Sequence, residues 1–306
     1  MLWKLPEIRI APDVIFYIGP LPVTNTLLCT WITIIILVIL CYLGTRKREL
    51  IPAGMQNLAE WAVESMLGMV EGVAGKVKGK IFFPLVATFF IFILFANLLD
   101  VVPGVDTIGT ITNPAAKSQA LFGFLLVNYN ISNQLIPWIR PATSDLNLTI
   151  AMALVSVVVT QILGFYMLGP KTQLSKYFNF RGIIVNGRFN PLGIIDAFVG
   201  LIEIVSETAR LISFSFRLFG NIFAGSVVLA VFAFLLPIVA NIVFNPLELF
   251  IGFMEAFVFA ILTLVFMEIG TSSHEALAEG EHDTREEHGQ KGTRKVDNLA
   301  EISPAR

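Results

Sequence analysis

Long apolar segments separated by shorter polar stretches dominate the pattern of this chain. Residues 24–43, 81–99 and 146–168 are almost free of charge, and each is close to the roughly 20 residues that a helix needs to cross a bilayer core. The pattern therefore predicts three upright spanning helices. In lipid, a single segment can satisfy all of its backbone hydrogen bonds by itself only as a helix, so we expect an all-α integral membrane protein.

Two further apolar segments, residues 191–236 and 241–270, are too long to stand upright. As one helix the first would extend about 69 Å at 1.5 Å per residue, roughly twice the thickness of the hydrocarbon core. Steep tilt is the way to accommodate such lengths. We therefore predict a hairpin of two long, steeply tilted helices, with its turn marked by Pro237, Asn245 and Pro246.

Two segments mix apolar and polar residues. Residues 55–73 combine Glu60, Glu64 and Glu71 with Trp61 and other apolar side chains, which is typical of an amphipathic helix on the cytoplasmic surface. Residues 122–138 are apolar but contain three asparagines and a proline. We interpret them as an interfacial or re-entrant piece of a loop over residues 101–145.

The distribution of basic residues predicts the orientation. Arg46, Lys47 and Arg48 follow the first span, and four basic residues lie between the third span and the hairpin. The positive-inside rule places both stretches in the cytoplasm. We expect four parts: an external N-terminal segment (1–23), the spanning helices with the amphipathic helix and external loop (24–190), the tilted hairpin with an ion pathway (191–273), and a cytoplasmic polar tail (274–306).

Composition narrows the class of function. Of 306 residues, 55% are hydrophobic and 14% charged, against about 25% charged in soluble domains. The net charge of −2 argues against nucleic acid as a partner. The three histidines of the tail lack metal-ligand spacing and no phosphate-binding loop is found, so we expect no metal and no cofactor.

A stripe of polar residues marks the first hairpin helix. At 100° per residue, six of them fall within roughly an 80° sector: Asp196, Glu203, Glu207, Arg210, Arg217 and Asn221. An arginine at mid-bilayer costs roughly 2.5–3.5 kcal/mol on insertion scales and keeps its proton. Arg217 has no acidic residue three or four positions away, so its counter-charge is expected on another helix or another chain. Glu203, Glu207 and Arg210 could instead form internal salt bridges that only hold the helix.

The chain direction sorts these groups by depth. Glu203 and Ser213 lie on the cytoplasmic side of Arg217, and Asn221 lies toward the outside. On the returning helix, Glu248 and Glu255 are seven residues apart and share a face. This is the layout of two half-channels separated by a fixed positive charge.

Two other classes of protein remain as alternatives. A secondary transporter that binds an anionic substrate with an intramembrane arginine would show inverted repeats and broken helices, and we find no such repeat. A purely structural membrane subunit would use the stripe as internal glue and would tolerate loss of Arg217 together with its counter-charge.

The segment Ser215-Phe216-Arg217-Leu218-Phe219-Gly220-Asn221 resembles the signature of subunit a of F-type ATP synthases. Further motifs occur in the family's order: Phe83-Pro84-Leu85, Asn97-Leu98-Leu99, Asp145-Leu146-Asn147 and Glu255-Ala256-Phe257. The resemblance implies a non-catalytic stator in a bacterial inner membrane, beside a ring of c subunits and with b-type peripheral stalk subunits.

The resemblance also assigns roles to residues. Arg217 matches the essential arginine that faces the ring carboxylate, Asn221 a residue of the external path, and Glu203 a carboxylate of the cytoplasmic path. The chain departs from the family at Ser226, where a titratable residue is common, and at Glu255, where glutamine is usual. We therefore expect Glu248 and Glu255 to act together as the outer proton relay.

Overall fold

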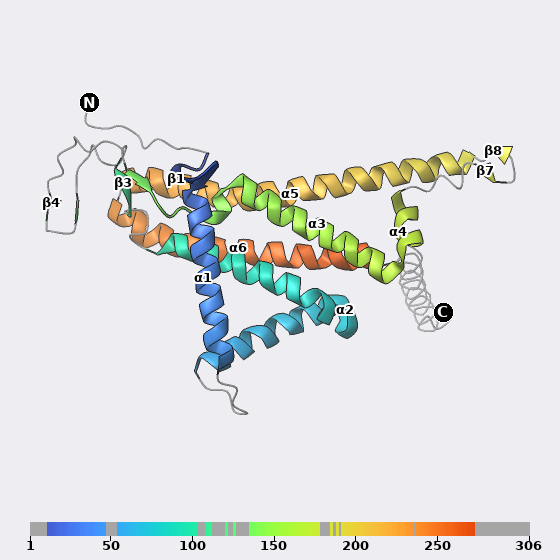
Figure 1. The fold of residues 1–306 in the computed structure, drawn as a ribbon, viewed down its shortest axis with the longest axis horizontal. Coiled ribbons are helices and arrows are strands. Elements are labelled where there is room, and N and C mark those ends of the chain that lie inside the picture. Colours follow the sequence, from blue (N-terminus) through green and yellow to red (C-terminus); the bar gives the residue numbers. More distant parts are fainter. Residues whose placement is uncertain are drawn as a thin grey trace, which may run out of the picture. The chain divides into compact units, whose positions relative to one another are not determined.

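The computed structural model describes residues 11–46, 54–102, 108–111, 120–121, 125–126, 135–177, 184–185, 188–189, 191–235 and 237–272. The predictions for Lys47, Arg48 and the tail over residues 274–306 lie outside these ranges, as does most of the loop over residues 101–145. The described residues contain five helices long and apolar enough to cross a membrane (Figure 1). The predicted all-α class is thus confirmed.

The five long helices agree with the hydrophobic pattern. They are α1 (Asn25–Arg46), α2 (Met55–Val101), α3 (Leu146–Leu168), α5 (Pro191–Leu235) and α6 (Pro237–Thr271). A 3-10 turn, η2 (Ala142–Ser144), precedes α3, and a short helix, α4 (Pro170–Tyr177), follows it. The chain forms two compact units, one of residues 1–158 and 202–265 and one of residues 159–201 and 266–306.

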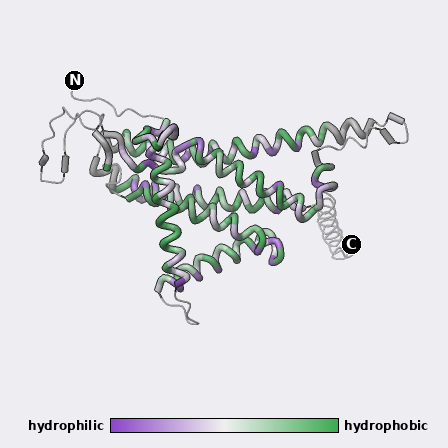
Figure 2. Tube along the Cα trace, viewed as in Figure 1, coloured by the Kyte–Doolittle hydropathy of each residue, from purple (hydrophilic) through white to green (hydrophobic). Residues whose placement is uncertain are grey.

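Helix α2 is divided by a bend at Gly75, whose φ of 75° and ψ of 166° interrupt the helix. The bend separates the predicted amphipathic helix (55–73) from the predicted span (81–99), and hydrophilic residues gather at it (Figure 2). Beyond the bend the chain turns back closely, because a Cβ on Gly79 would lie 3.1 Å from Cα of Glu71. Trp61, in the half before the bend that corresponds to the predicted amphipathic helix, is 66% exposed and so leaves a large apolar side chain on the surface of the chain.

The turn of the hairpin agrees with the prediction at Pro237 and differs from it at Asn245 and Pro246. Helix α5 ends at Leu235 and α6 begins at Pro237, so Asn245 and Pro246 lie inside α6. Proline cannot donate to the carbonyl four residues earlier, which usually ends a helix in water. Apolar helices accommodate proline because neighbouring helices and local adjustments satisfy the freed backbone groups.

Short antiparallel strand pairs, which the pattern did not predict, join the helices. They are β1 (Val14–Ile18) with β2 (Leu21–Thr24), β3 (Gly109–Ile111) with β6 (Leu135–Pro137), β4 (Ala120–Leu121) with β5 (Leu125–Leu126), and β7 (Ile184–Val185) with β8 (Arg188–Phe189). The segment 122–138, interpreted above as an interfacial or re-entrant piece, is extended wherever it is described within residues 125–126 and 135–137.

Aromatic packing fixes α2, α5 and α6 against one another in the first unit. The ring of Phe259 on α6 lies 5.3 Å from Phe89 of α2 and 5.5 Å from Phe214 of α5, measured between centroids. Such pairs contribute about 0.5–1.5 kcal/mol beyond the area they bury. Phe259 therefore sets the level at which the three helices meet.

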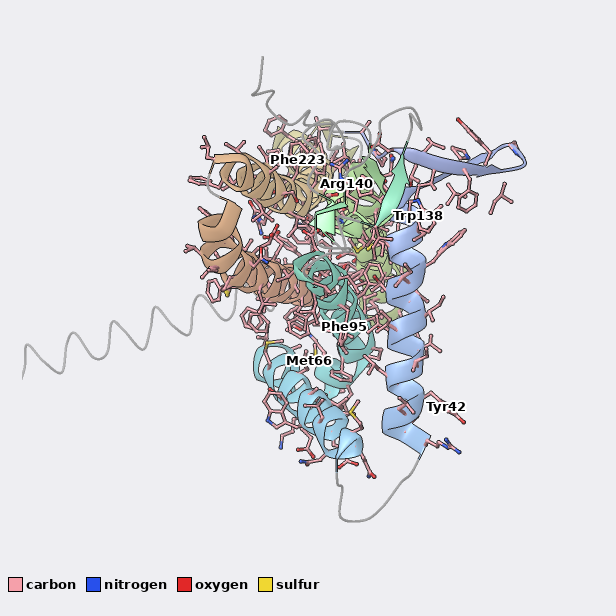
Figure 3. The ribbon with its side chains drawn as sticks, turned by 90° about the vertical axis from the view of Figure 1, so that its left-hand side faces the viewer. Tyr42, Met66, Phe95, Trp138, Arg140 and Phe223 are labelled. Carbon is pink, nitrogen blue, oxygen red and sulfur yellow. The ribbon has the colours of Figure 1, made fainter. Side chains whose placement is uncertain are left out.

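Hydrogen bonds close the end of the unit where α1 begins. Thr26 Oγ1 donates to Asp145 Oδ2 at 2.9 Å, and both side chains are buried. Figure 3 shows Trp138 and Arg140 near this end of α1, and Tyr42 toward the other. Arg140 donates to the carbonyl of Ala11 at 3.3 Å. Burial lowers the pKa of Arg140, and the nearby carboxylates, of which Asp13 acts most strongly, oppose this shift.

In the second unit, α4 folds back onto α3. Gly169 makes the turn with a φ of 82°, and buried Gln173 donates from Nε2 to Gln161 Oε1 at 2.9 Å. A Cβ on Gly164 would lie 2.7 Å from the Gln173 side chain, so a larger residue there would displace the end of that side chain from its place.

Candidate functional site

Helix α5 presents Arg217, Asn221 and Gly225 at four-residue spacing, which places them on one face. The rotation of α5 is fixed by a second face, because Phe214, Leu218 and Ile222 are at most 5% exposed. The apolar residues therefore anchor the helix, and the face that carries Arg217 is left for polar contacts.

Arg217 is exposed on the surface of the chain. Within the described part of the chain, its guanidinium has no hydrogen bond and no ion pair, although it interacts electrostatically with Glu255. A permanent charge presented in this way, on a helix of membrane-spanning length, is costly unless a partner supplies the counter-charge.

Glu255 of α6 meets Asn221 of α5. Asn221 Nδ2 donates to Glu255 Oε2 at 2.7 Å, at the short end of the range for N–H···O bonds. The glutamate is 6% exposed, and within the described chain its other oxygen, Oε1, is buried without a hydrogen-bond partner. One carboxylate oxygen is thus fixed, and the other can still accept or carry a proton.

Glu248 lies against α5 further along the same helix pair. Its Oε1 is 3.6 Å from the place where a Cβ on Gly225 would be, which is ordinary contact distance, so the carboxylate lies directly against α5. Beside it, the hydroxyl of Ser226 donates back to the carbonyl of Ile222 at 3.1 Å. The predicted outer residues Asn221, Glu248 and Glu255 are therefore all at the contact between α5 and α6.

Glu203 and Ser213, the residues predicted for the cytoplasmic side, are on α5 apart from this group. Glu203 is half-buried and Ser213 is exposed. Glu203 precedes Arg217 by fourteen residues, which corresponds to about 21 Å along a helix. Neither side chain has a hydrogen bond to another described residue, and the side chain of Asp196 lies outside the described ones.

Sequence reasoning missed the role of three residues, Asn97, Thr143 and Gly252, whose hydrogen bonds join α2 and the η2 turn to α6. Asn97 of α2 is 5% exposed; its Nδ2 donates to the carbonyl of Gly252 at 3.1 Å, and its Oδ1 accepts from Thr143 Oγ1 at 2.6 Å. The available signal was an asparagine inside an apolar span, which usually has an interhelical partner.

Among the described residues, no cluster of His, Cys, Asp and Glu could hold a metal.

Comparison with known proteins gives a consistent answer. Residues 27–268 match the protein family described as ATP synthase A chain. ATP synthase subunit a of Moorella thermoacetica is 30% identical over 259 residues, covering 85% of this chain and 96% of that protein. The subunit of the same name from Campylobacter jejuni subsp. doylei is 32% identical over 235 residues, covering 76% and 84%. That from Oceanobacillus iheyensis is 27% identical over 258 residues, covering 81% and 90%.

Proposed function

The chain belongs to the ATP synthase A chain family, the proton-conducting stator subunits of F-type ATP synthases, and we propose that Arg217 is the fixed charge at which its two proton paths meet. The chain is a multi-pass membrane protein that is not itself catalytic and that works with the other ATP synthase subunits. The secondary-transporter alternative is set aside, because the family match covers most of the chain.

Arg217 acts on a carboxylate of a rotating ring of c subunits. The observation that carries this proposal is the exposed guanidinium, without an ion-pair partner in the described chain, one helical turn from the bonded pair Asn221–Glu255. A guanidinium next to a ring carboxylate favours its ionised form, so that the carboxylate gives up its proton there. The same charge repels a proton that would otherwise pass directly from one path to the other.

The outer path runs along the contact between α5 and α6. A proton enters past Glu248, passes Glu255 and Asn221, and neutralises a ring carboxylate. Glu255 is suited to this step because one oxygen is held by Asn221 and the other is unbonded in the described chain. Glu248 and Glu255 are seven residues apart on one face of α6, about 10 Å along the helix, so a proton would move inward from one carboxylate to the next in steps.

The inner path lies on the cytoplasmic side of Arg217, past Ser213 and Glu203. The neutral ring site turns through lipid, reaches this path after almost a full turn and releases its proton. The carboxylate of that ring site, now ionised, is attracted to Arg217, and the cycle repeats. Each proton that crosses supplies about 2.3 kcal/mol per 100 mV of membrane potential.

The membrane arrangement follows from the same proposal. The strands β1 and β2 face the outside, the first half of α2 lies on the cytoplasmic surface, and the chain ends in the cytoplasm of a bacterial cell. Helices α5 and α6 are strongly tilted beside the ring, because α5 would extend about 68 Å if upright. The b-type peripheral stalk holds the chain stationary.

Replacement of Arg217 by alanine in the assembled ATP synthase tests the proposal. We expect ATP synthesis driven by an imposed proton gradient to stop, while the amount of assembled complex is unchanged. Arg217→Lys should also fail, because a lysine can lose its charge in an apolar setting and lacks the planar fork of arginine. Arg210→Ala, which removes the same charge two turns away on α5, is the matched control. Synthesis at the wild-type rate by Arg217→Ala would refute the proposal.

A further inference from the structure

We infer that Asn97 is a positioning residue of the outer proton path, because its side chain fixes the rotation of α6 that directs Glu248 and Glu255 toward α5. The inference rests on the proposed role of these two carboxylates. Asn97 is remote from them in sequence and is on a different helix, α2.

The contact between α2 and α6 is unusually close at this point. A Cβ on Gly252 would lie 2.9 Å from Cβ of Asn97, a distance that real side chains essentially never show. Gly252 thus lets the amide of Asn97 reach the α6 backbone, and its carbonyl accepts the 3.1 Å hydrogen bond. Any larger residue at position 252 would push the two helices apart.

The orientation of the amide is also fixed. Thr143 Oγ1 donates to Asn97 Oδ1 at 2.6 Å, so Nδ2 of the amide is the atom that faces α6. Both side chains are buried, Asn97 at 5% exposure and Thr143 at 0%, so water does not compete for either bond. The η2 turn, the α2 amide and the α6 carbonyl form one chain of hydrogen bonds.

This clamp acts on the carboxylates through helix geometry. At about 100° per residue, Glu248 and Glu255 lie about 40° and about 60° around α6 from Gly252, in the same direction. Holding Gly252 against α2 therefore turns both carboxylates toward α5, where Glu255 meets Asn221 and Glu248 meets Gly225. If α6 rotated by a few tens of degrees, both contacts would be lost together.

The experiment compares Asn97→Leu with the wild type in the complete ATP synthase. The first readout is geometric: cysteines replace Phe232 of α5 and Phe244 of α6, whose rings lie 4.5 Å apart, in a background with Cys29 and Cys41 changed to alanine. Cross-linking by a short bifunctional thiol reagent reports the packing of α6 on α5 without any proton transport. We expect the yield of cross-linked chain to fall severalfold in Asn97→Leu.

The second readout is the rate of proton-driven ATP synthesis as a function of external pH. The charged group that acts on Glu255 is Arg217 from α5, Glu248 lies two turns away on α6 itself, and Asn97 of α2, which contacts α6 at Gly252, does not titrate. We expect Asn97→Leu to lower the rate about tenfold or more, since misplacement by about 1 Å can cost as much as 100-fold, and to shift the pH profile. In a Glu255→Gln background the shift should disappear.

Ser156→Ala is the matched control. It removes another buried hydrogen bond to α6, the 3.3 Å bond to Thr263, which lies eight residues after Glu255 on that helix. Both readouts should be unchanged. If Asn97→Leu does not assemble, Thr143→Val removes only the hydroxyl that orients the amide and should show the same changes in milder form.

Two results would overturn the inference. One is wild-type cross-linking and rates in Asn97→Leu and Thr143→Val. The other is a loss of assembled complex whose remaining active fraction keeps the wild-type pH profile, which would make the contact purely structural. Failure of the proposed outer path is a separate result, since it would appear as wild-type rates in Glu248→Gln.

Discussion

Glu255→Gln is the substitution that tests the outer path most sharply. Glutamine has the size of glutamate, and its carbonyl oxygen can still accept the 2.7 Å hydrogen bond from Asn221. What it cannot do is bind and release a proton. The helix contact is therefore kept while the titration of residue 255 is removed.

The expected size of the effect follows from the bond. A hydrogen bond to a charged group contributes about 1.5–3 kcal/mol, and a neutral one about 0.5–1.5 kcal/mol. Weakening by about 1 kcal/mol changes an equilibrium about fivefold, which is the least effect expected on a step that uses this contact. Loss of a proton carrier from the path comes in addition, so we expect synthesis to slow by at least about fivefold.

The assay is ATP synthesis by complexes in vesicles, driven by an imposed proton gradient and measured over a range of external pH. Glu60→Gln is the matched control, because it makes the same chemical change on an exposed glutamate of α2 that accepts a 2.7 Å bond from Gln56. Glu248→Gln should be more damaging than Glu255→Gln. If Glu255→Gln showed wild-type rates at every pH, the relay would be confined to Glu248 and Glu255 would only line the path.

Three further substitution or labelling experiments probe the geometry. Gly225→Leu should displace the Glu248 carboxylate and slow synthesis about tenfold, since overpacking costs about 1–3 kcal/mol. Gly225→Ala should be near the wild type, because its Cβ would lie in ordinary contact, 3.6 Å from Oε1 of Glu248. Equal rates in both variants would contradict the contact. Thr26→Val should lower the temperature at which the purified complex loses this chain. The buried Asp145 carboxylate would lose a hydrogen-bond donor, and leaving a buried acceptor unsatisfied costs about 1–3 kcal/mol. An unchanged temperature would show that water replaces the hydroxyl. Single cysteines at Tyr17 and Asn57, both exposed, should react with a membrane-impermeant reagent from outside and from the cytoplasm respectively, and reaction from the same side would refute the orientation.

The membrane class and the main helices could be predicted because they depend on local composition. Helix α3 occupies the predicted residues 146–168, and α5 ends within one residue of the predicted 236. The hairpin turn lies at Pro237, as predicted, but Asn245 and Pro246 were wrongly included in it, because Pro246 was given the helix-breaking role it has in water, whereas the structure keeps it inside α6. Six of the described strands were missed because two or three residues are too few to show an alternating pattern. The longer pair, β1 with five residues and β2 with four, was missed because residues 14–18 are all apolar and show no alternation.

The site was only partly predictable, because its contacts depend on how helices meet. The sequence placed Arg217 and Asn221 on one face and Glu248 and Glu255 on another. It could not pair Asn221 with Glu255, since nothing local in the sequence sets the register of α5 against α6. Asn97 and Gly252 are 155 residues apart, and nothing local connects them.

The bend of α2 has a consequence for the insertion of the chain into the membrane. Lys76, Lys78 and Lys80 follow Gly75 directly and precede the apolar half of the helix. Lysines within a few residues of a span hold that end in the cytoplasm during synthesis. In the proposed orientation, the stretch of chain that ends the surface half would therefore also set the direction in which α2 crosses. Every later helix would inherit its orientation from that crossing, and with it the side of the membrane from which each proposed proton path opens.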